Sequence, residues 1–144
     1  MSDATLAELL ERIVLAGVGL TTRALAEATP GLDLTFPQWR VLVVLGEDAE
    51  GATVSEVAGR IGVTVPATSR QLRRLARRGL VRIGPDANDR RASRASLTTA
   101  GRAARGAILT FRRRHIEDSA SNVDVADATL RELASIAHAL DEYR

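Results

Sequence analysis

Apolar side chains recur at helical spacing along most of this chain and alternate in only one short region. Between residues 3 and 28 they fall on one face of a helix, at Leu6, Leu9, Leu10, Ile13, Val14, Gly17, Val18 and Leu25. The sequence Thr29-Pro30-Gly31 then breaks the periodicity. The pattern predicts an amphipathic first helix over residues 3–28.

A second helix is expected to begin at Thr35. Pro37 falls in its first turn, where the N–H that proline lacks has no helical partner to lose. Its apolar side consists of Trp39, Leu42, Val43 and Leu45. A polar turn over residues 47–51 follows.

Two further helices are predicted, separated by a short glycine-containing turn. Thr53 and Glu56 have the spacing of a capping box, and the helix that they open reaches about Arg60. Thr64 caps the next helix, which runs over residues 65–78 and ends at Gly79. A helix, a tight turn and a second helix form a helix-turn-helix pattern.

The alternating region indicates a β-hairpin. Residues 80–83 and 94–97 have the two-residue period of strands, with Val81 and Ile83 on one face and Arg82 on the other. Residues 84–91 between them are rich in turn formers and arginine. A hairpin directly after a helix-turn-helix, with a long basic tip, is a wing.

Two helices complete the chain. Thr98 or Thr99 caps a long helix to about Ser119, with an inner stripe at Ala100, Ala104, Ala107, Ile108, Phe111 and His115. Asp124 is expected to cap a last helix whose inward face carries Leu130, Leu133, Ile136, Ala137, Leu140 and Tyr143. The 144 residues thus predict a single, mainly α domain with a small β-hairpin.

The charge is divided unevenly along the chain. All 20 basic residues are arginine, and ten of them lie between Arg60 and Arg94 with only two acids, Asp86 and Asp89, which gives that window a formal charge of +8. The other ten arginines face sixteen acids, which leaves −6 and accounts for the overall +2. A cationic module in an acidic chain favours a polyanionic partner, above all nucleic acid.

The helix over residues 65–78 separates its charge from its apolar side chains. On a helical wheel Arg70, Arg73 and Arg74 share one face, opposite Thr68, Leu72 and Leu75. Such a helix suits a DNA major groove, with Arg70 best placed to bond guanine. Arg77 and Arg78, near its end, are expected to contact phosphate or solvent.

Further DNA contacts are expected around this helix and on the wing. Small residues allow close approach at its first turn, and hydroxyl groups at helix starts can hold phosphate. An arginine at a hairpin tip, braced by an aspartate, can enter a narrow minor groove. The residues concerned are Ser55, Thr64, Pro66, Ala67, Arg90, Arg91 and Arg94.

Several function classes find no support in the composition. The absence of cysteine excludes disulfides and thiolate zinc sites, and the absence of lysine excludes a P-loop or a Schiff base. No catalytic residue, cofactor or metal site is predicted. No signal peptide or membrane span is read, so a cytoplasmic, nucleoid-associated protein is expected.

Three segments together resemble the MarR family of bacterial transcription regulators. Residues 34–42 look like the second helix of that family, residues 75–81 like the end of its recognition helix, and residues 86–101 like its wing and fifth helix. The resemblance implies a winged helix-turn-helix lobe, residues 33–99, flanked by dimerisation helices, residues 3–28 and 100–144. It also implies a homodimer on a pseudo-palindromic operator.

The family resemblance further implies release of DNA when a small molecule binds between the dimer helices and the lobe. Trp39, Arg40, Phe111 and His115 are candidates for such a site, although a structural role is the simpler interpretation of each. Neither the existence nor the identity of a ligand follows from the sequence.

The favoured hypothesis is a sequence-specific transcriptional regulator, a ligand-responsive repressor. An architectural DNA-binding protein would use the same surface without sequence choice, and similar affinity for all duplexes would identify it. The hypothesis that the protein is an enzyme is disfavoured, and turnover that depends on His115 would be needed to support it. A winged helix that contacts an acidic protein is the fourth hypothesis.

Overall fold

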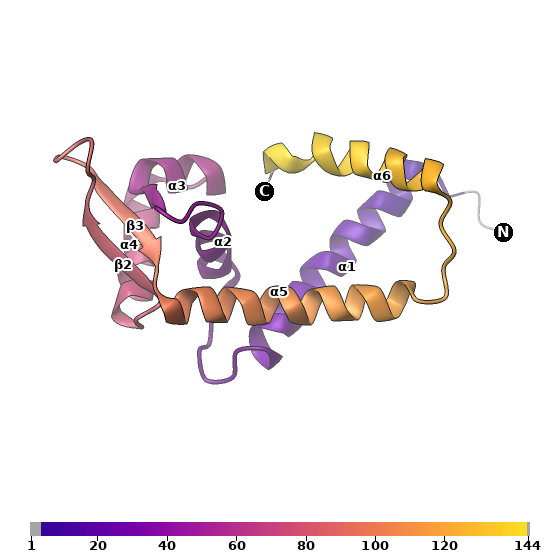
Figure 1. Cartoon of the computed structure of the whole chain (residues 1–144), viewed down its shortest axis with the longest axis horizontal. Coiled ribbons are helices and arrows are strands. Elements are labelled where there is room, and N and C mark those ends of the chain that lie inside the picture. Colours follow the sequence, from indigo (N-terminus) through magenta and orange to yellow (C-terminus); the bar gives the residue numbers. More distant parts are fainter. Residues whose placement is uncertain (1–3, 144) are drawn as a thin grey trace.

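The computed structural model describes residues 4–143 and places a compact winged lobe at one end of a long helix (Figure 1). The predicted single domain includes both ends of the chain. Its terminal residues, such as Asp3 and Arg144, lie outside the described residues. The elements are α1 (Leu6–Glu27), α2 (Phe36–Leu45), β1 (Ala52–Thr53), α3 (Val54–Ile61), α4 (Val65–Arg77), β2 (Val81–Pro85), β3 (Ser93–Leu97), α5 (Thr99–Ala120), α6 (Asp127–Ala139) and the 3₁₀ helix η1 (Asp141–Tyr143).

Threonine side chains begin the first five helices, as the sequence predicts for four of them. Thr35 and Thr53 each accept a bond from a backbone N–H three residues on, and the Gln38 or Glu56 side chain accepts one in return. The backbone N–H of Thr53 also holds the pKa of Glu56 below its ordinary value. Thr5 forms a third such box with Glu8, which the sequence reading did not include.

The wing belongs to a three-stranded antiparallel sheet with the order β1-β3-β2. The predicted hairpin is confirmed, with Val81 opposite Leu97 and Ile83 opposite Ala95. The edge strand β1, which pairs Ala52 with Ala95, was not predicted because two residues cannot show alternation.

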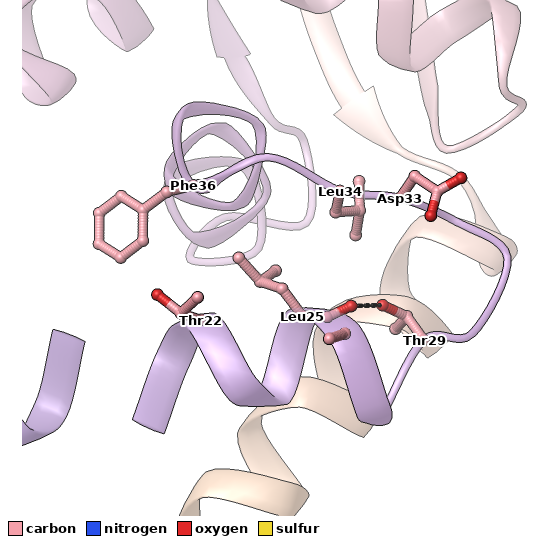
Figure 2. Close-up of a pocket in the computed structure, with 7 residues that line it drawn as sticks. Thr22, Leu25, Thr29, Asp33, Leu34 and Phe36 are labelled. Carbon is pink, nitrogen blue, oxygen red and sulfur yellow. Dashed lines mark hydrogen bonds between the residues drawn. The ribbon is translucent and has the colours of Figure 1, made fainter. Parts of the chain in front are cut away.

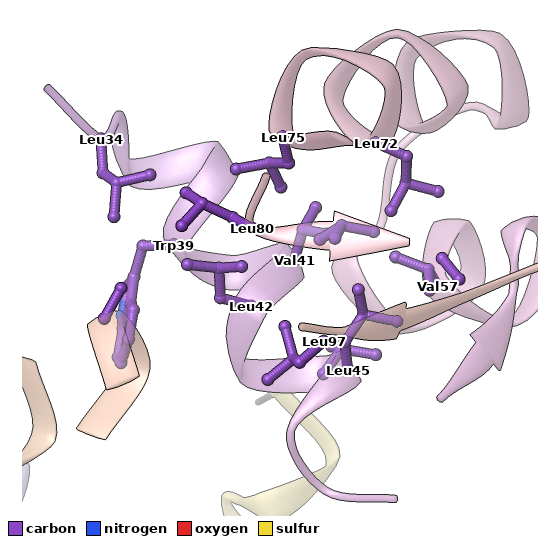
Figure 3. Packing of buried hydrophobic residues seen from close by; sticks show 14 of the residues in the cluster. Leu34, Trp39, Val41, Leu42, Leu45, Val57, Leu72, Leu75, Leu80 and Leu97 are labelled. Atoms are coloured by element: carbon purple, nitrogen blue, oxygen red, sulfur yellow. The ribbon is translucent and has the colours of Figure 1, made fainter. Parts of the chain in front are cut away.

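The core of the lobe lies between α2, α4 and the sheet (Figure 3). Leu72 and Leu75 of α4 are fully buried, and so is Thr68, as the wheel predicts. Helix α2 is buried on several sides, and its Trp39 is only 3% exposed. A helix with so little polar surface fixes the position of the α3–α4 pair packed on it.

Two details of the C-terminal helices differ from the prediction. Ala100 is exposed, and Gly101 is the buried residue instead, because a Cβ there would lie 2.0 Å from the carbonyl oxygen of Leu80. Asp124 does not cap α6. The backbone is still irregular at that point, and the helix begins after Ala126 without a side-chain cap.

The apolar stripes of α1 and α6 are largely uncovered. Within the described part of the chain, no residue of α6 is buried, so the inward face predicted for it is wrong for an isolated protomer. Figure 1 shows that the chain turns back after α5, so that α6 runs above α5 in the direction of the lobe and stands apart from it. The exposed apolar side chains include Leu6, Leu9, Ile13, Val14, Leu15 and Val18 of α1 and Leu130 and Leu133 of α6.

Candidate nucleic-acid interface

Helix α4 presents a continuous cationic face to solvent. Arg70, Arg73 and Arg74 are exposed, on the side of the helix opposite its buried residues. Across residues 4–143, none of these three guanidinium groups pairs with a carboxylate. Their charge is therefore left for a partner outside the protomer.

The start of α4 has the small and polar surface that the sequence predicts. Thr64 is exposed, and its hydroxyl accepts a bond from the N–H of Ala67 at 3.4 Å. Pro66 is exposed and Ala67 half-buried, and Ser55 is exposed in the first turn of α3. These residues leave the first turns of both helices accessible.

The base of the wing is held by a buried ion pair. Arg94 of β3 donates from Nε to Asp86 Oδ1 at 2.6 Å, and Asp86 is only 6% exposed. The Arg94 hydrogen bond is the main cause that holds the pKa of Asp86 below its ordinary value. The other oxygen of Asp86 accepts the backbone N–H groups of Asn88 and Asp89. Asp86 thus organises the whole loop.

Arg94 also ties the wing to the rest of the lobe. Its Nη1 donates to the carbonyl of Gly51 at 3.0 Å, so two of its nitrogens are used inside the protomer. The sequence places Arg94 among the DNA contacts, whereas this geometry favours a bracing role. Arg90 and Arg91, at the tip, are exposed.

Arg78, at the end of α4, bonds within the protomer. It is half-buried, and its Nη1 donates to Gln38 Oε1 at 3.2 Å. Arg77 is exposed beside it. The Gln38 contact joins residues forty positions apart, and no local pattern predicts it.

The four ligand candidates all make contacts within the protein itself. Trp39 belongs to the core, and Arg40 donates to the carbonyl of Ile61 at the end of α3, at 2.8 Å. Phe111 and His115 stack on each other with ring centroids 4.2 Å apart. Nδ1 of His115 lies 2.9 Å from the Phe111 carbonyl oxygen.

A groove of about 370 Å³ lies instead where α1 meets the start of α2 (Figure 2). None of the four candidates lines it. Its lining comes from α1, the connection and the first residue of α2: Thr22, Leu25 and Ala26, then Thr29, Asp33 and Leu34, and finally Phe36. No sequence pattern indicates this groove, because its residues are ordinary components of a helix and a turn.

Comparison with known proteins identifies the arrangement of lobe, wing and long helices. A MarR family model matches residues 32–92, which span the second helix, the helix-turn-helix and most of the wing. Wild-type MarR from E. coli, in its apo form, superposes with a TM-score of 0.74 and 26% identity, over 95% of this chain and 98% of that one. The middle of the chain therefore matches the MarR family model, and the chain as a whole has the fold of E. coli MarR.

Two other MarR-like structures share the fold at lower identity. CouR from Rhodococcus jostii RHA1, bound to p-coumaroyl-CoA, has a TM-score of 0.73 and 23% identity, with 96% and 95% of the two chains covered. A mutant of MepR from S. aureus, bound to an oligodeoxyribonucleotide, has a TM-score of 0.67 and 23% identity, with 99% and 100% covered. No curated protein sequence matches the chain.

The family model and the structural neighbours are those of MarR-family transcriptional regulators. Among the described residues, no group of three or more histidine, aspartate or glutamate side chains is placed to hold a metal ion. None of the helices over residues 4–143 has both the length and the apolar character of a membrane span.

Proposed function

We propose that this chain is a MarR-family repressor that binds a pseudo-palindromic operator as a homodimer in the bacterial cytoplasm, on the nucleoid. The observation that carries sequence-specific binding is the unpaired guanidinium face of α4, where Arg70, Arg73 and Arg74 are exposed opposite the core. Bidentate arginine contacts to guanine are the commonest specific contacts in the major groove.

The wing provides the second contact. Arg90 and Arg91 at its tip reach the adjacent minor groove, while Arg94 and Asp86 hold the hairpin in place. In this proposal Arg94 positions the wing and does not touch DNA, because two of its nitrogens already have protein acceptors.

The homodimer is supported by the uncovered apolar faces at the two ends of the chain. Residues 3–28 and 100–144 form the dimerisation region, and residues 33–99 form the DNA-binding lobe. Side chains such as Ile13 (64% exposed) and Leu130 (51%) are buried when two copies pack their α1 and α6 helices together. Two lobes then meet half-sites about one helical turn apart.

Ligand response is supported by the groove between α1 and the start of α2. It joins a dimerisation helix to the lobe, so an occupant there would alter the angle between them. The CouR structure holds p-coumaroyl-CoA. We propose a small, partly apolar effector for this chain, because Leu25, Leu34 and Phe36 line the groove beside two threonines.

The function is tested by selection from a pool of random duplexes at one fixed salt concentration. We expect enrichment of a pseudo-palindrome with a footprint on both half-sites. Equal affinity for selected and random duplexes would instead identify an architectural DNA-binding protein. An acidic protein that remains bound after nuclease treatment would point to protein contacts.

A further inference from the structure

The start of α2 and the end of α4 share a single hydrogen-bond acceptor. Gln38 Oε1 accepts the backbone N–H of Thr35 at 3.1 Å and the Arg78 guanidinium at 3.2 Å. Gln38 is 6% exposed, so water cannot easily replace either donor. The same atom completes the cap of one helix and holds the end of another.

Most of the remaining contact between α4 and the core is apolar. Leu72 and Leu75 keep the helix against the lobe, but apolar burial has no preferred direction. A hydrogen bond, in contrast, weakens steeply when its angle changes. The bond from Arg78 to Gln38 is therefore a directional restraint on the C-terminal end of α4. The hydroxyl of Thr68 bonds only within the helix, to the Thr64 carbonyl, and does not restrain its orientation.

Arg78 lies at the point where this restraint is most effective. It is the C-cap residue of α4, and the next residue, Gly79, turns the chain with φ of 70°. Rotation of α4 about its own axis would move Arg78 away from Gln38 and would turn the face that carries Arg70 and Arg74 relative to the lobe. A fixed end thus preserves the orientation of the cationic face.

We propose that Gln38 is a positioning residue for DNA recognition, through which Arg78 fixes the orientation of α4 without contacting DNA itself. This inference rests on the proposed function, since it requires α4 to read a specific duplex. Gln38 acts on the ratio of specific to non-specific affinity. The charge that draws the protein to any duplex resides on other arginines.

The test uses four variants of the full chain: Gln38→Ala, Arg78→Ala, the double variant and Gln38→Glu. Each binds the duplex selected by the wild type and an unselected duplex, over a range of salt concentrations. We expect each alanine substitution to lower the specific-to-non-specific ratio about ten-fold, the effect of one buried hydrogen bond. The double variant should lose no more than the larger single loss.

Rescue by the conservative variant separates positioning from general destabilisation. Gln38→Glu keeps an acceptor for both donors and adds a charge opposite Arg78, so the ratio should stay at the wild-type value. Glu8→Ala is the matched control, because Glu8 fills the same position in the capping box of α1 without a link to α4. It should leave the ratio unchanged, whatever it does to the thermal midpoint.

Three results would overturn the inference. Additive losses in the double variant would show that the two residues act separately. Equal weakening of both duplexes by Arg78→Ala, with the salt slope reduced by about one, would make Arg78 a phosphate contact. An unchanged ratio in Gln38→Ala would remove the role of Gln38. Failure of the proposed function would look different: the wild type itself would show no preference among duplexes, and its specific-to-non-specific ratio would be one.

Discussion

At the scale of single residues, the arginines of this chain divide into those that pair inside the protomer and those that do not. Arg78 and Arg94 have protein acceptors, whereas Arg70, Arg73 and Arg74 are exposed and pair with none of the carboxylates in the described structure. A uniform basic patch would give every arginine the same role. In the proposed function the paired arginines brace the lobe and the exposed ones contact DNA.

Arg70→Ala should weaken binding to the selected duplex by about 1–3 kcal/mol and relax the preference at one base pair. The reason is loss of a bidentate contact that one base alone satisfies. Affinities for single-base variants of the selected duplex, at one salt concentration, measure it. Arg77→Ala is the comparison and should weaken all duplexes alike. The same uniform weakening by Arg70→Ala would reassign Arg70 to the phosphate backbone.

The ion pair between Asp86 and Arg94 should make the stability of the folded protein depend on pH. Its pKa in the folded protein is lowered, chiefly by Arg94, whereas that of an unfolded aspartate is about 3.9. The stabilisation from the pair is therefore complete above about pH 4 and is lost as the pH falls through the lowered folded value. Urea unfolding at pH 7 and pH 3 should show a smaller loss of stability in Asp86→Asn than in wild type.

Glu50→Gln provides the control for Asp86, because Glu50 is an exposed acid in the loop before β1. It should retain the pH dependence of the wild type. If Asp86→Asn and wild type lose the same stability between the two pH values, the ion pair is not what holds the base of the wing.

At the scale of helices and strands, local signals in the sequence predicted most boundaries. Thr35, Thr53 and Thr64 were each expected to begin a helix, and each does so by accepting a backbone N–H. The prediction failed where the local signal was weak or misleading. β1 is too short to show a period, and Asp124 has the right chemistry for a cap but lies in backbone that is not yet helical.

Contacts that only the folded chain creates were outside the reach of sequence reasoning. The groove joins residues 22–29 to residues 33–36, and the bond of Arg78 to Gln38 crosses forty residues. In both cases the side chains are of common types, and only the fold brings them together. The ligand candidates Trp39 and His115 do not line the groove.

Two glycines of α5 should respond oppositely to alanine. At Gly101 a Cβ would lie 2.0 Å from the Leu80 carbonyl oxygen, so Gly101→Ala must shift the backbone and should cost about 1–3 kcal/mol. At Gly106 no described atom lies within 4 Å of such a Cβ, so Gly106→Ala should stabilise the helix by about 1 kcal/mol. Urea unfolding at one protein concentration measures both. Effects of equal sign would contradict the packing of α5 on the turn before β2.

Filling the groove should imitate an effector. Ala26→Trp places a large side chain in the groove, and we expect the affinity for the selected duplex to fall by about 5–150-fold, the usual range of coupling between sites. DNA titration at fixed salt measures the change. Ala26→Ser leaves the groove open and should bind like wild type. An unchanged affinity in Ala26→Trp would separate the groove from DNA binding.

At the scale of the whole molecule, the amphipathic pattern identified the apolar face of α6 but not what covers it. Leu130 and Leu133 are 51% and 41% exposed in the protomer. A sequence pattern reports that a face is apolar and is silent about whether the covering surface belongs to the same chain. The proposed dimer supplies that surface from a second copy.

Leu133→Glu should therefore yield a monomer in sedimentation experiments, because a carboxylate cannot be buried unpaired in an apolar interface. The affinity for a full operator should fall, while the weak affinity for a half-site should stay the same. Ser135→Glu introduces the same side chain on the opposite side of α6 and should remain dimeric. A dimeric Leu133→Glu protein would exclude this face from the interface.

The bond from Arg94 to the Gly51 carbonyl has a consequence for how a dimer would recognise the spacing between two half-sites. It fastens the hairpin to the segment just ahead of α3, so that hairpin and helices tilt as one rigid block. Any adjustment to a longer or shorter operator must then arise where α1 and α5 leave that block. When the central spacer of an operator changes by a single base pair, α1 and α5 should bend to accommodate it. The geometry of the hairpin should stay the same.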